Sequence, residues 1–127
     1  MVEGQTIRAA FLEQPAAPPP RRARRSAGDR LRTALMNLAD HHAQILDHRE
    51  TAWSSITFSG ARHTLTLMFA GPDAVAAGEH FMAELPEHEF AIARQLVADA
   101  TITEAEHRMV PSPRLIVRCE LLLLEES

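Results

Sequence analysis

Histidine is the side chain best suited to chemistry in this sequence, because seven histidines occur among 127 residues. His80, Glu84 and His88 are spaced i, i+4 and i+8. On one continuous helix this spacing would align them along a single face, where they could chelate a divalent metal ion. Pro86 interrupts that geometry, because a helix should end before His88. We therefore expect a solvated helix face here. The alternative is a small metal- or ligand-binding enzyme that uses His80 and Glu84.

The other histidines fall in two groups. His41 and His48 would share the outer face of a predicted helix, but two turns apart, ~10 Å along the axis, which is too far for one ion. His42 lies on the apolar stripe of that helix, where we expect a core-edge imidazole with a hydrogen-bond partner. His63 and His107 stand near two predicted turns and could act as general acid and base if those turns converged. The spacing favours solvated turn residues. The candidate ligand set is nevertheless His63, His80, Glu84 and His88.

Other catalytic groups are missing from the sequence pattern. Cys119 is the single cysteine, which excludes an intramolecular disulfide, and it lies on a predicted apolar strand where a buried thiol is inert. The five glycines do not cluster into a phosphate-binding loop, and no serine sits in a nucleophile elbow. We expect no cofactor and no metal centre, and the sequence favours a protein that is not an enzyme.

Basic side chains concentrate near the N-terminus. All 13 basic residues are arginine, and the whole chain carries a net charge of −4. The cluster Arg21, Arg22, Arg24 and Arg25 follows a run of prolines, and such an arm could contact phosphates or an acidic protein surface. It lacks aromatic residues for base stacking, and the remainder of the chain is acidic. A solubilising linker is the favoured interpretation, and nucleic-acid association through the arm is the alternative.

The elements that must position these residues follow from hydrophobic periodicity. Residues 1–28 are predicted to be a flexible Pro/Arg-rich arm, and residues 29–127 a single domain. We expect a helix over 29–50 with Asp29 as its N-cap, and a hairpin of strands 54–58 and 64–69. A second helix starts at Pro72 and is ended by Pro86, and a second hairpin pairs 92–103 with 115–124. The order α-β-β-α-β-β predicts an α+β two-layer sandwich: an antiparallel four-stranded sheet with helices on one face.

The last predicted strand is apolar on both faces. Leu115 to Leu123 alternate toward one face, while Ile116, Leu122 and Leu124 occupy the other, where a solvated sheet should be polar. A second subunit is the simplest cover, and the N-terminal arm is the alternative. No apolar stretch approaches the ~20 residues of a membrane span, and no signal-peptide run is present. The sequence therefore predicts a cytoplasmic, non-catalytic binding or assembly domain that forms a homodimer through its sheet.

Overall fold

The computed structural model describes residues 26–126. Within this range the chain forms two α-helices, one short 3-10 helix and four strands. Their bounds are α1 Ala27–Leu38, β2 Ala43–Ser54, β3 Ser59–Ala70, α2 Pro72–Glu84, η1 Leu85–Glu87, β4 Gln95–Arg108 and β5 Arg114–Glu125. The order α-β-β-α-β-β is the predicted one, so the α+β fold class is confirmed.

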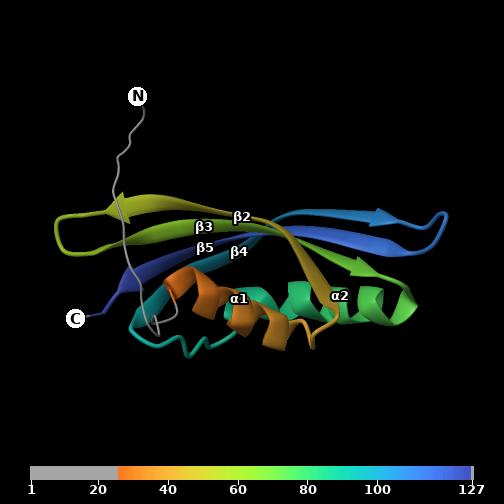
Figure 1. The fold of residues 1–127 in the computed structure, drawn as a ribbon, viewed down its shortest axis with the longest axis horizontal. Coiled ribbons are helices and arrows are strands. Elements are labelled where there is room, and N and C mark those ends of the chain that lie inside the picture. The colour runs from red at the N-terminus through yellow and green to blue at the C-terminus, as the bar shows by residue number, and fades with distance from the viewer. Residues whose placement is uncertain (1–25, 127) are drawn as a thin grey trace, which may run out of the picture.

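The four strands form one antiparallel sheet in the order β2-β3-β5-β4. The two hairpins, β2–β3 and β4–β5, are joined side by side through β3 and β5. Both helices lie on the same face of this sheet, which makes two layers (Figure 1). The loops of the two hairpins lie at opposite ends of the sheet.

The core fills the space between the helices and the sheet. Alternate residues of β3 and β5 point into it, as a period of two requires, and both helices add apolar side chains at helical spacing. The completely buried apolar side chains are Leu31, Leu35, Ala39, Leu65, Leu67, Phe69, Phe81, Leu85, Val117, Cys119, Leu121 and Leu123. The predicted inward face of the last strand is therefore confirmed.

The second helix forms where the sequence places it. Pro72 occupies the first turn, and the chain leaves the α-helix at Leu85, just before Pro86. Gly78 packs α2 tightly on the sheet, because a Cβ there would lie 2.8 Å from side-chain carbons of Phe69 and Leu115.

The prediction for the first helix is wrong at both ends. The N-cap is Ser26, whose hydroxyl accepts a hydrogen bond from the Asp29 N–H at 3.0 Å, and Asp29 completes the capping box. The helix ends at Leu38, because Asp40 and His41 adopt φ values of 56° and 60°. The N–H of His41 donates to the Met36 carbonyl at 2.8 Å, which is the closing bond of a Schellman motif. Glycine usually marks such an end, and none is present here.

Strand β2 therefore occupies residues 43–54, of which 43–50 were expected as the second half of that helix. The turn of the first hairpin lies at residues 55–58 instead of 59–62. Ser55 organises it, since its hydroxyl accepts hydrogen bonds from the N–H groups of Thr57 and Phe58. The strand predicted over 92–103 is also displaced: Arg94 adopts a φ of 66°, so β4 begins at Gln95 and runs to Arg108.

Two strand segments at the edges of the sheet are less covered than its centre. Residues 103–108 of β4 are all exposed, although the β5 residues Leu115 and Val117, which lie opposite, are buried. On β2, residues 49–54 are exposed except for Trp53. The helices thus cover the middle of the sheet and leave half of each edge strand in solvent.

Candidate functional site

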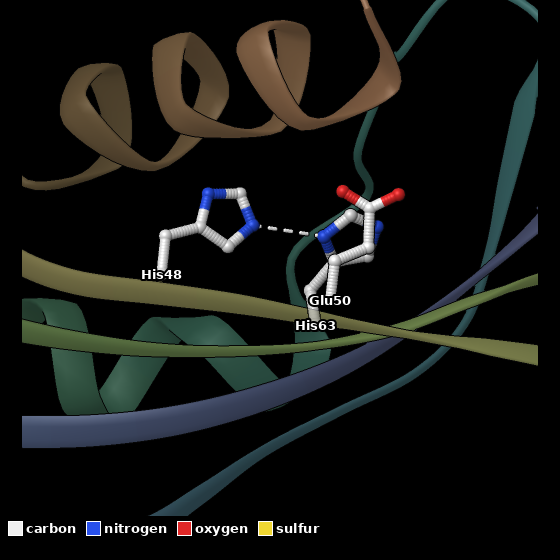
Figure 2. A group of neighbouring side chains, drawn as sticks. All are labelled: His48, Glu50 and His63. Atoms are coloured by element: carbon white, nitrogen blue, oxygen red, sulfur yellow. Dashed lines mark hydrogen bonds between the residues drawn. The ribbon is translucent and has the colours of Figure 1, made fainter. Parts of the chain in front are cut away.

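Three metal-capable side chains meet between the sheet and the first turn of α1. His48 and Glu50 come from β2, and His63 comes from β3, opposite Glu50 in the strand register. Each offers one ligand atom, and these atoms lie within 4.8 Å of one another. Figure 2 shows the three side chains rising from the two strands toward α1. A Cβ on Gly28 would lie 3.3 Å from the His48 ring and 3.5 Å from a Glu50 carboxylate oxygen, so α1 closes over the group.

A chain of hydrogen bonds fixes the proton positions in this cluster. Arg32, which is paired with Asp29, contacts Nδ1 of His48 at 2.5 Å, and a guanidinium can only donate. His48 therefore carries its proton on Nε2 and donates it to Nδ1 of His63, at 2.9 Å. It follows that His63 carries its own proton on Nε2. That atom is buried and has no hydrogen-bond partner in the part of the chain that the structure describes.

The pKa values of both imidazoles are lowered. Burial lowers the pKa of His48, and the adjacent His63 and Arg32 lower it further, against a smaller opposing effect of Glu50 and Asp47. Burial also lowers the pKa of His63, where Glu50 acts in the opposite direction and Arg32 in the same direction. Two rings in direct contact next to a guanidinium have little capacity for an added proton.

The sequence-based prediction for His63 as a solvated turn residue is wrong. His63 is 1% exposed, because the hairpin turn lies at 55–58 and residue 63 is a core-facing position of β3. His48 was expected on the outer face of a helix. It was left out of the candidate ligand set because residues 43–50 were assigned to that helix. Once β2 is placed as a strand, the i, i+2 pair of His48 and Glu50 is the signal that could have found the site.

The remaining candidate ligands lie elsewhere. His80 and Glu84 are exposed on α2, and His88 is exposed just beyond η1. His80 and His88 line the same surface groove of about 680 Å³ between α1, α2 and residues 88–91, while Glu84 does not line it. Within residues 26–126, the donors close enough to share one ion are those of the His48 cluster.

Other predicted positions are resolved as follows. His42 is exposed in the turn after α1, so the expectation of a core-edge imidazole is wrong. Cys119 is buried as predicted, and burial raises the pKa of its thiol to about 12. The arginine cluster of residues 21–25 lies outside the described residues. None of the helices in the described range is long and apolar enough to cross a membrane.

Large apolar side chains are exposed at both hairpin loops. Ile56 and Phe58 are 106% and 45% exposed at the β2–β3 loop. Met109 and Val110 are 63% and 79% exposed at the β4–β5 loop. We call these pairs the two apolar tips. By contrast, Leu122 and Leu124 are only 9% and 6% exposed within the single chain, and Ile116 is half-buried.

Comparison with known proteins gives a fold and nothing finer. No protein-family model matches the chain, and no curated protein matches it. Among solved structures, the chain is similar to one described as "Virion of native gene transfer agent (GTA) particle", with a TM-score of 0.53 and 16% sequence identity. The likeness covers 77% of this chain and 91% of that chain. At this level of identity it establishes a shared fold alone.

Proposed function

We propose that this protein is a non-catalytic assembly domain that packs against other protein subunits in a multi-subunit particle. The observation that carries the proposal is the fold shared over 91% of a chain from a gene transfer agent virion. Such a particle is built from protein–protein contacts, so a chain of the same fold and similar extent suits the same kind of role.

The two apolar tips support this proposal independently. Solvent-exposed Ile, Phe, Met and Val side chains in loops gain free energy when a partner removes them from water, about 25 cal/mol per Å² of apolar area. Monomeric proteins rarely keep such groups together without an interaction that uses them. The tips lie at opposite ends of the sheet, so one subunit has two separate places for a contact (Figure 1).

The contacts we propose are between copies of this chain. The sequence points to a homodimer formed through the outer sheet face, but Leu122 and Leu124 offer little free surface for it. The two apolar tips offer more exposed apolar surface. A dimer that joins like tips would be closed by a two-fold axis, whereas contact between unlike tips would extend into a ring or a longer array.

Native mass spectrometry of the full-length protein over a concentration series tests the proposal. We expect species larger than a monomer. At least one of the two double variants, Ile56→Ser with Phe58→Ser or Met109→Ser with Val110→Ser, should shift the distribution toward monomer. Leu46→Ser is the matched control, because Leu46 is 47% exposed but lies within β2, away from both hairpin loops.

The masses separate the forms of assembly. A dimer that dissociates in only one of the two tip variants indicates contact between like tips. Larger species that dissociate in both variants indicate contact between unlike tips. A monomer at high micromolar concentration in every variant would contradict self-assembly. Loss of assembly in the Leu46→Ser control, with none in the tip variants, would place the contact on the sheet instead.

A further inference from the structure

The cluster of His48, Glu50 and His63 carries an inference that is independent of assembly. We propose that Nε2 of His48, Nδ1 of His63 and a carboxylate oxygen of Glu50 bind one divalent transition-metal ion of the class of Zn²⁺ or Ni²⁺. This departs from the expectation, drawn from the sequence, that the protein holds no metal. Imidazole nitrogen with a carboxylate oxygen is a donor set that these ions accept.

The distances are close to those that an ion requires. Zinc binds imidazole nitrogen at about 2.0–2.1 Å, so two nitrogens on one tetrahedral ion stand about 3.3 Å apart. Nε2 of His48 and Nδ1 of His63 are 2.9 Å apart, and the donor atoms of the three residues lie within 4.8 Å of one another. The rings need to separate by a few tenths of an ångström and to rotate, so that both lone pairs point at the ion instead of along the line between the two nitrogens. The Glu50 carboxylate stands beside the His63 ring, on the same side of the sheet (Figure 2).

The state of His63 is the second observation that indicates a ligand. Its ring is 1% exposed, and its Nε2–H has no partner in the described chain. A buried donor without a partner is destabilising, and an apolar side chain at this position would avoid that cost. Because Nε2 lies across the ring from Nδ1, an ion at Nδ1 leaves this donor as it is. His63 also already holds the tautomer that metal binding at Nδ1 requires, because its proton is on Nε2. An imidazole kept in the core at this cost, with its lone pair aimed at a second imidazole, fits a ligand role.

Arg32 opposes the ion in the present arrangement. Its guanidinium donates to Nδ1 of His48 and so keeps the His48 proton on Nε2, the atom that must bind the metal. Metal-bound histidines normally donate their other N–H to a carboxylate or a carbonyl oxygen. Binding therefore requires the His48 proton to move from Nε2 to Nδ1, and Arg32 to swing away. The Arg32 side chain is 39% exposed and paired with Asp29, so it has room and a partner to do so.

This opposition supplies a sharp test. In the variant Arg32→Gln, the amide oxygen can accept the Nδ1–H of His48, which is the partner that a metal-bound histidine prefers. Outer-shell partners of this kind change metal affinity by about 10–100-fold. We expect Arg32→Gln to bind the ion tighter than the wild type by that factor.

The experiment measures Zn²⁺ and Ni²⁺ binding to the full-length, chelator-treated protein by isothermal titration calorimetry, with bound metal per chain counted after dialysis. One site per chain is expected, and it should be lost in His48→Gln and in Glu50→Gln, both partly exposed positions where folding can be checked by circular dichroism. His80→Gln is the matched control, because His80 is an exposed histidine of the same chain.

Each result decides the proposal. One site that His48→Gln and Glu50→Gln abolish, that His80→Gln leaves intact and that Arg32→Gln strengthens would support it. Binding that only His80→Gln removes would overturn it, as would the absence of a one-to-one site in both the wild type and Arg32→Gln. These measurements do not involve subunit mass, so their failure is distinct from a failure of the assembly proposal.

Discussion

Gly78 allows α2 to approach the sheet, and we expect Gly78→Ala to gain no stability although alanine is the better helix former. A Cβ at this position would lie 2.8 Å from carbons of Phe69 and Leu115, both buried. Carbon atoms in contact prefer about 3.5–4.0 Å, so the helix must move by roughly 0.7–1.2 Å or the core side chains must leave their rotamers. Overpacking of this kind costs about 1–3 kcal/mol, whereas alanine returns about 1 kcal/mol of helix propensity. The net free energy of unfolding should therefore fall by about 0–2 kcal/mol.

A neighbouring position calibrates the propensity contribution. Ala76 lies on the same helix and is exposed, so Ala76→Gly should cost about 1 kcal/mol with no change in packing. Urea unfolding followed by circular dichroism gives both free energies, and 1 kcal/mol shifts the midpoint by about 0.3–1 M for a small domain. If Gly78→Ala instead stabilises the protein by as much as Ala76→Gly destabilises it, the close approach of α2 is refuted.

Three further predictions concern buried and capping groups. Because the pKa values of His48 and His63 are lowered in the folded chain, the unfolded chain binds more protons near pH 6, and the free energy of unfolding of the metal-free protein should fall as the pH drops below about 6.5. Urea unfolding between pH 7.5 and 5.5 measures this, and His48→Gln should reduce the slope while His80→Gln should not; equal slopes in all three proteins would contradict the assignment. The Cys119 thiol, with its pKa raised to about 12, should not react with a thiol-specific disulfide reagent at pH 8 until urea unfolds the chain, and fast reaction of the folded protein would show that the thiol is accessible. Ser26→Ala removes the N-cap hydroxyl of α1 and should cost about 1 kcal/mol by the same unfolding assay, whereas an unchanged midpoint would mean that the cap contributes nothing measurable.

The element order was predictable because its strongest signals are local. Gly71 and Pro72 start α2, Pro86 ends it, and the alternation in residues 115–124 identifies β5. These signals depend on residues whose backbone preferences are narrow, namely proline and glycine, or on a long apolar strand with a clear period of two.

The first helix was mispredicted because its end has no such marker. Asp40 and His41 take the left-handed conformation that glycine usually provides, and apolar residues continue beyond them at spacings that also fit a helix. Strand β2 is largely exposed, so its alternation is weak, and its pairing with β3 decides its conformation.

That one error hid the candidate site. His48 and Glu50 face the same side only in a strand, and His63 meets them only when the hairpin turn lies at residues 55–58. His80 and His88 belong to the i, i+4, i+8 pattern with Glu84, and this pattern can be seen without knowing which strands pair. The pair that forms a hydrogen-bonded contact depends on the strand register, which a single sequence specifies poorly.

The uneven cover of the sheet divides the domain into parts of different local stability. Residues 103–108 of β4 pair with β5 on one side and are all exposed, so little buried surface holds this edge segment in place. Their amide hydrogens should exchange through local opening, while those of β3, at the centre of the sheet, should exchange only when the whole domain unfolds. The sheet ends can thus adjust to a neighbouring surface at small free-energy cost, and the middle of the domain keeps its shape while they do so.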